Sequence, residues 1–148
     1  MPLETFPPAD PEEIDLGIAT DKVCHIILKA RAWDAKQADD DPASGSNATD
    51  DGMADVLENQ PDRDATYAEL VAFIRALDIE EQVNLVALAW VGRGTYELSE
   101  WQQALETARG EHNDRTAEYL LGLPMLGDYL EEGLAVFNES CDEFNSRI

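Results

Sequence analysis

The sequence predicts an all-α protein, a compact single-domain bundle of about six helices around a central apolar helix at residues 79–91. Two observations support this prediction. Apolar residues recur every three or four positions through most of the chain after residue 20, whereas no strand pattern or internal repeat stands out. The 148 residues are 44% hydrophobic, which allows one domain with a core that needs no metal or disulfide.

Residues 1–19 are expected to form an extended arm ahead of a helical domain at residues 20–148. The arm contains four prolines and little periodicity. Thr20 is then expected to cap a first helix at residues 21–37, which carries four of the ten basic residues. Residues 38–52 follow as a polar loop without periodic apolar residues.

The second half of the chain has clear helix start signals. A short apolar turn at residues 53–58 is expected to stop before Pro61. Three pairs of residues then have the spacing of a capping box, in which two side chains satisfy the first free N–H groups of a helix. These pairs are Thr66 with Glu69, Asp78 with Glu81, and Ser99 with Gln102.

The central helix follows the second capping box. Residues 79–91 place apolar side chains almost all round the helix axis, as expected for a helix that is covered on every side. Gly92 and Gly94 are expected to end it. Asn113 or Asp114 is then expected to cap a shorter helix.

The last predicted helix carries an apolar stripe two heptads long. Its positions step by three or four residues, which suits packing inside a monomer or the seam of a homodimer. The stripe consists of Leu126, Leu130, Leu134, Phe137, Cys141 and Phe144.

The charge of the chain limits its partners. It has 32 acidic and 10 basic residues and a net charge of −22, and residues 1–62 and 63–148 each carry −11. Because no cluster of Lys and Arg offsets this field, nucleic acid and membranes are not expected as direct partners, whereas a basic protein or a cation is plausible. Solvation of the helix faces and adaptation to high salt are two alternative explanations of the acidity.

The predicted location is the cytoplasm. The first ten residues lack the basic and apolar regions of a signal peptide, and no run of 18 apolar residues occurs. Cys24 and Cys141 are far apart and lie in apolar helical surroundings, so both are expected to be buried, reduced thiols. His25 follows Cys24 directly, but adjacent helical positions point about 100° apart, which argues against a catalytic Cys–His pair.

Established catalytic motifs are absent from the sequence. It contains no P-loop, GxGxxG, HExxH or GxSxG pattern, and no cofactor is predicted. His112, with Glu111, Asp114 and Glu118 nearby, offers ligands for a hard metal ion but has no second His within ligand spacing. We therefore expect His112 to be an exposed loop residue beside a helix cap.

A small-ligand or catalytic cleft is an alternative function. Arg93 lies between Gly92 and Gly94, which allow a close backbone approach to a neighbour or a ligand. Equally, Gly92 can be an ordinary helix terminator and Arg93 an ion-pair partner, and Asp128 can serve the dipole of the last helix. The cleft would require the fold to bring together Arg93, Arg115, Tyr119 and Asp128.

A weak divalent-cation site is the third possibility. Residues 47–58 fit the spacing of a twelve-residue calcium loop, with Gly52 at its sharp turn. The expected oxygen ligands are Asn47, Thr49, Asp51, the Met53 carbonyl, Asp55 and Glu58. The context argues against a specific site, because the loop lacks an entering helix and its first and third positions lack carboxylates.

Several strings of the second half resemble one bacterial family. They are residues 85–94 (LVALAWVGRG), 115–122 (RTAEYLLG) and 126–134 (LGDYLEEGL). Residues 18–24 and the turn at 50–53 are similar to the same family, domain of unknown function 3775 (DUF3775). The resemblance covers about residues 18–135 and implies a small bacterial protein without an assigned activity or catalytic residue. The residues after Val136 are expected to be an extension particular to this chain.

The leading functional prediction is a small acidic interaction module in the cytoplasm that has no catalytic activity and is a monomer or a homodimer. It follows from the one-sign charge, the folded core and the lack of a catalytic constellation. A basic protein is the expected partner, and salt should slow its association.

Overall fold

A computed structural model describes residues 14–39 and 61–147 of the chain. Within these ranges the regular secondary structure is entirely helical, with seven α-helices and one 3-10 turn. The all-α prediction is therefore confirmed. Most of the predicted arm, most of the polar loop and the turn at residues 53–58 lie outside the described residues.

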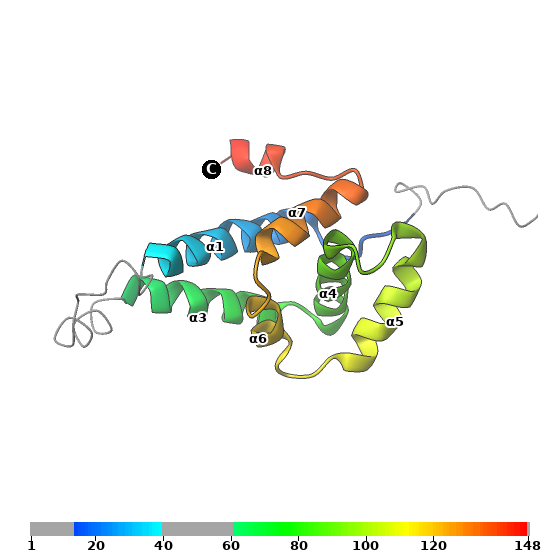
Figure 1. Ribbon diagram of the computed structural model, residues 1–148, viewed down its shortest axis with the longest axis horizontal. Helices are drawn as coiled ribbons and strands as arrows, with labels where there is room; N and C mark the ends of the chain where they lie inside the picture. The colour runs from blue at the N-terminus through cyan, green and yellow to red at the C-terminus, as the bar shows by residue number, and fades with distance from the viewer. Residues whose placement is uncertain (1–13, 40–60, 148) are drawn as a thin grey trace, which may run out of the picture.

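The helices pack around α4, which lies in the middle of the molecule (Figure 1). They are α1 (Thr20–Asp39), α3 (Pro61–Ala76), α4 (Ile79–Arg93), the 3-10 turn η3 (Leu98–Glu100), α5 (Trp101–Glu111), α6 (Thr116–Leu121), α7 (Leu126–Val136) and α8 (Asp142–Ser146). Helix α4 contacts α5 and α7, α1 contacts α3 and α7, and α3 contacts α6. None of the described helices has the length and apolar character needed to cross a membrane.

Helix α4 is the predicted central helix. Asp78 and Glu81 form the predicted capping box: the Asp78 side chain accepts from the Glu81 N–H at 2.7 Å, and the Glu81 side chain accepts from the Asp78 N–H at 3.0 Å. All nine residues from Val83 to Val91 are buried. Because the helix is covered on every side, it needs apolar residues on every side, and this explains why its sequence has no polar face.

The end of α4 differs from the prediction at one glycine. Gly94 has a φ of 93° and ends the helix, with its own N–H and that of Thr95 bonded to the last carbonyls, as in a Schellman motif. Gly92 lies inside the helix and does not terminate it. A Cβ atom at Gly92 would overlap the carbonyl oxygen of Tyr129 in α7. Gly92 is thus needed for close contact between two helix backbones.

Two of the three predicted capping boxes, and the Thr20 cap, are wrong. Helix α3 begins at Pro61, which suits the first helical position, so Thr66 lies inside the helix and is buried. Ser99 lies inside the 3-10 turn that precedes α5, so it does not begin a helix. The N–H group bound by a side chain here is that of Glu97, which donates to the Glu100 side chain at 2.8 Å. Thr20 is the first residue of α1 and not the residue before it, and its hydroxyl donates to the Glu139 carboxylate at 3.2 Å.

The last predicted helix is broken. Helix α7 ends at Val136, and α8 begins at Asp142. Asn138 adopts a left-handed φ of 61°, and the N–H groups of Asn138 and Glu139 bond to carbonyls of the last turn of α7. This is a Schellman motif with Asn at the left-handed position, which Asn tolerates better than most residues. The apolar stripe therefore does not continue as one helical seam, and most of its side chains are buried within the chain.

The prediction of two reduced thiols is also wrong. Cys24 in α1 and Cys141, the residue before α8, form a disulfide, with their Cα atoms 5.7 Å apart. Both residues are buried as predicted. Their separation of 117 residues gave no signal, because the pairing depends on the break after α7 that returns the chain to α1. An ion pair of 2.7 Å between Arg147 and Asp21 also holds this segment to α1.

Replacing Gly92 by Ala should strongly destabilise the protein. The added methyl group forces α4 and α7 apart, and overpacking of this kind costs about 3 kcal/mol of unfolding free energy. Gly110→Ala is the matched control, because an added Cβ there meets no atom within 4 Å. This control should stabilise α5 by about 0.5–1 kcal/mol. Urea unfolding measures both, and equal small effects would show that the helices do not touch at Gly92.

Reduction of the disulfide should lower stability by about 2–5 kcal/mol, because the bridge closes a very long loop in the unfolded chain. Urea unfolding of the oxidised protein and of the Cys24→Ser/Cys141→Ser double variant measures the loss. Thiol titration of the denatured, unreduced protein provides the check. Two titratable thiols in that sample would contradict the bridge.

Candidate functional site

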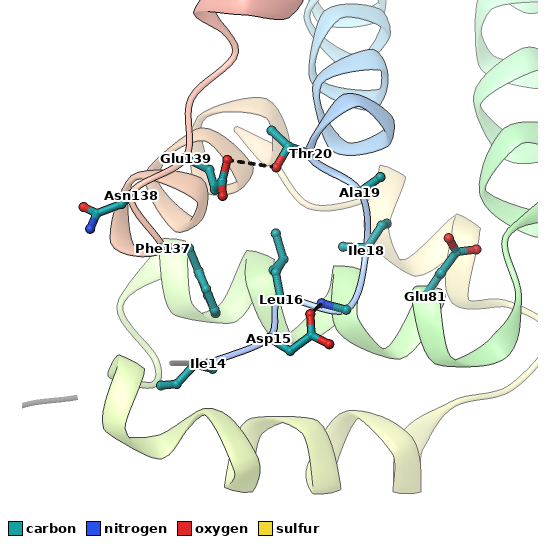
Figure 2. A pocket seen from close by; sticks show the side chains of 11 residues that line it. Ile14, Asp15, Leu16, Ile18, Ala19, Thr20, Glu81, Phe137, Asn138 and Glu139 are labelled. Carbon is teal, nitrogen blue, oxygen red and sulfur yellow. Dashed lines mark hydrogen bonds between the residues drawn. The ribbon is translucent and has the colours of Figure 1, made fainter. Parts of the chain in front are cut away.

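A cleft of about 940 Å³ lies at the start of α1 (Figure 2). Its walls are the segment of residues 14–20, which leads into α1, and the turn of residues 137–139, which follows α7; Glu81 of α4 completes the lining. Apolar side chains and carboxylates both line it. The apolar residues are Ile14, Leu16, Ile18 and Phe137, and the acidic residues are Asp15, Glu81 and Glu139.

The first wall is shaped by a turn at Gly17. The Gly17 N–H donates to the Asp15 carboxylate at 2.9 Å, and Gly17 has a φ of 82°, a conformation that glycine adopts without steric cost. Gly17 also packs directly on Asn84 of α4, where any larger side chain would collide with the amide group. Asn84 donates to the carbonyl of Glu80 at 2.7 Å and to that of Gly17 at 3.4 Å. These bonds anchor the incoming segment on the central helix.

The second wall is the turn after α7. Phe137 is buried and packs edge to face against Trp101, with ring centroids 4.9 Å apart. Glu139 accepts a hydrogen bond from the Thr20 hydroxyl at 3.2 Å, which joins the turn to the first residue of α1 (Figure 2). The disulfide of Cys141 lies two residues further on. The turn is therefore held against α1 by a covalent and a polar contact.

The third acidic group, Glu81, is tied to the protein by two donors. Lys22 Nζ lies 2.6 Å from its carboxylate, and the Asp78 N–H donates to it at 3.0 Å. The Lys22 contact first, and then the backbone N–H, hold the pKa of Glu81 below its ordinary value. Glu81 is therefore ionised at neutral pH, and Lys22 offsets its charge, so Asp15 and Glu139 are the lining carboxylates that have no ion pair with a described residue.

The arrangement suits recognition of a cation better than catalysis. The lining contains no Ser, Cys or His nucleophile beside a base, and its charged groups are all carboxylates. Buried Leu16, Ile18 and Phe137 supply an apolar surface next to those carboxylates. Such a cleft can hold a positively charged group attached to an apolar body.

The four residues predicted for a ligand cleft have different side-chain partners, although Arg115 and Tyr119 lie one helical turn apart at the start of α6. Arg93 donates to the Thr95 hydroxyl at 3.0 Å, beyond the end of α4. The other three have different partners. Arg115 lies 4.0 Å from Glu118, Tyr119 accepts from the Trp90 indole N–H at 2.9 Å, and Asp128 pairs with Arg31 at 2.7 Å.

The predicted divalent-cation site falls outside the part of the chain that the structure describes. Residues 47–58, with the proposed ligands Asn47, Thr49, Asp51, Asp55 and Glu58, lie outside the described residues. Within the described ranges, no group of three or more His, Cys, Asp or Glu side chains could hold a metal ion. His112 was predicted to be exposed, but it is half-buried. Its Nε2 atom lies 2.8 Å from the Gln82 side-chain oxygen.

Comparison with known families identifies one segment of the chain. Residues 67–138 match DUF3775, a family described as a protein of unknown function. The predicted resemblance is thus confirmed over α4 to α7 and most of α3. No curated protein and no solved structure matches the chain.

The DUF3775 segment contributes only part of the cleft. Glu81, Phe137 and Asn138 lie within the match, whereas residues 14–20 and Glu139 lie outside it. Sequence reasoning did not place these residues together. The sequence carries two signals that are typical of chain reversals. Gly17 follows Asp15 by two positions, and Asn138 lies at the end of an apolar helix.

Lys22→Met should reduce stability at neutral pH by less than about 1 kcal/mol, because Lys22 is 44% exposed and its charge is screened. Since the pair lowers the pKa of Glu81, its contribution exists above the ordinary glutamate pKa and disappears as pH falls through the lowered value. Wild type and variant should therefore become equally stable in acid. Lys29→Met, which breaks a 3.4 Å pair with the exposed Glu69, is the control and should have a smaller effect. A loss independent of pH would indicate packing of the lysine stem instead.

Proposed function

We propose that this protein is an acidic interaction module without a reaction of its own, and that the cleft of Figure 2 receives a basic segment of a partner protein. The observation that carries the proposal is the composition of the cleft. Apolar side chains and three carboxylates, one of them paired with Lys22, line one cavity of about 940 Å³. A lysine or arginine side chain has the matching form, because it joins an apolar stem to a positive end.

The charge balance of the surface supports a basic partner. Eight Lys and Arg side chains are described, and seven of them pair with carboxylates of the same chain. The exception among them is Arg93, which bonds to Thr95. With its described cations already engaged, the protein keeps a net charge of −22 that attracts positive partners from a distance.

The same charge disfavours two other occupants. Residues 1–13, which precede the cleft, contain four acidic residues and no Lys or Arg, so they do not complement its carboxylates. A second copy of the chain would bring another 22 negative charges. Repulsion of this size opposes self-association through an acidic surface. A basic segment of a different protein is the occupant that the charges favour.

The cellular compartment stays a prediction. The cytoplasm was expected, but the disulfide between Cys24 and Cys141 weighs against a reducing compartment, because structural disulfides are rare in the cytosol. This disulfide joins the turn at the cleft to α1, so the same redox conditions that preserve it also preserve the proposed site.

A peptide of alternating lysine and leucine should bind the protein, and its affinity should fall as salt is raised, because the carboxylates are screened. Asp15→Asn/Glu139→Gln should weaken binding about five- to tenfold, since it removes two of the cleft charges while keeping their hydrogen-bond acceptors. Fluorescence anisotropy of a labelled peptide measures both effects. The matching glutamate–leucine peptide should not bind.

The control for the cleft is Glu97→Gln/Glu106→Gln, which makes the same charge change at exposed positions near and on α5. It should alter affinity less than about twofold. An equal loss in both double variants would show that the general field, and not the cleft, attracts the peptide. Absence of binding by the basic peptide at low salt would overturn the proposal.

A further inference from the structure

We propose that a second cavity, between α4, α5 and α6, binds small organic amines. Its volume is about 540 Å³, which lies in the range of small-molecule sites. It shares no lining residue with the cleft of Figure 2, and all its lining residues fall within the DUF3775 segment. This site is therefore independent of the proposed docking of a basic segment.

The cavity offers an apolar and aromatic surface. Val83 and Val86 of α4 and Ala108 of α5 are buried and line it. Trp90 and Tyr119 line it as well, and the Trp90 indole N–H donates to the Tyr119 oxygen at 2.9 Å. Tyr119 is 43% exposed, so part of its side chain is accessible to a ligand. Together these groups can take up a ring or a short hydrocarbon body.

Two polar atoms of the lining retain free hydrogen-bonding capacity. Tyr119 accepts from Trp90, so its hydroxyl proton remains available. The Gln82 side-chain nitrogen donates to the Leu77 carbonyl at 3.0 Å, so the Gln82 oxygen accepts from His112 Nε2 at 2.8 Å. The proton of a neutral His112 ring therefore lies on Nε2, and Nδ1 is an acceptor. The described residues offer Nδ1 no hydrogen-bond partner.

The charge of the lining selects the ligand class. Glu111 contributes a carboxylate, and no Lys or Arg lines the cavity. Arg75 and Arg115 line a neighbouring cavity and pair with Glu118 at 2.6 and 4.0 Å. Arg109, which lies between the lining residues Ala108 and Gly110 in the sequence, pairs with Glu80 at 2.8 Å. An anionic ligand would thus meet an uncompensated carboxylate in a strongly negative protein, whereas a protonated amine would be attracted.

An amine fits the remaining groups as well. Its N–H donors suit the acceptors that Glu111 and His112 provide, and its positive charge suits the aromatic rings of Trp90 and Tyr119 in the lining. Its carbon skeleton suits the apolar floor. The proposed ligand class is therefore a small primary amine that carries an aromatic or aliphatic body.

The test compares two probes with the same ring and opposite charge, phenethylamine and phenylacetate. Phenethylamine should bind with a dissociation constant of about a millimolar, as expected for a fragment of this size, and should shift the indole N–H resonance of Trp90 in NMR spectra. Phenylacetate should leave that resonance unchanged. Trp90→Phe identifies the resonance, and its spectrum shows whether the variant remains folded.

Matched variants test the role of the carboxylate. Glu111→Gln should weaken phenethylamine about three- to fivefold, whereas Glu106→Gln, on the same helix but outside the cavity, should leave its affinity unchanged. Thermal unfolding confirms that both variants are folded. Equal binding of the two probes, equal effects of the two variants, or no shift at Trp90 with phenethylamine would each overturn the proposal.

Discussion

The close crossing of α4 and α7 is the contact on which the rest of the structure depends. At Gly92 the backbone of α4 touches the backbone of α7, and at Gly133 the relation is reciprocal, because a Cβ there would lie 2.6 Å from the Leu88 carbonyl oxygen. The two glycines remove the side chains that normally separate helices. This contact fixes the position of α7 against α4, and the Asn138 turn at the end of α7 then leads residues 137–139 to the start of α1.

Both candidate sites follow from this placement of α4. One end of the helix supplies Glu81 to the acidic cleft, and its middle supplies Val83, Val86 and Trp90 to the second cavity. The disulfide at Cys141 adds a covalent connection to α1, so the wall of the cleft cannot separate from the helix bundle while the bridge is intact. A single buried helix therefore organises two chemically different surfaces, one acidic and open, the other aromatic.

Local signals in the sequence predicted the helices better than they predicted the sites. The apolar run of residues 79–91 and the Asp78 capping box identified α4, because both depend on nearest neighbours along the chain. Gly92 was ambiguous, since a helix terminator and a close-contact residue have the same sequence appearance, and only the position of α7 separates them. The break at Asn138 was missed because the apolar spacing continues across it.

The site residues were harder to predict because they meet through long-range contacts. Asp15 and Glu139 are 124 positions apart, and neither belongs to a motif that would indicate the other. The ion pair between Asp128 of the last long helix and Arg31 of α1 is another contact of this kind, because the two residues are far apart in the sequence. The proposed class of partner rests on the charge composition, which does not depend on which residues become neighbours.

Native-state hydrogen exchange tests the central role of the α4–α7 crossing most directly. If this contact organises the bundle, amides from Val83 to Val91 and in the middle of α7 should exchange only through global unfolding, while those of α6 and α8 should exchange through smaller openings. Amides of α4 that exchange more easily than those of α1 and α3 would contradict the account, because the bundle would then persist without its proposed central contact.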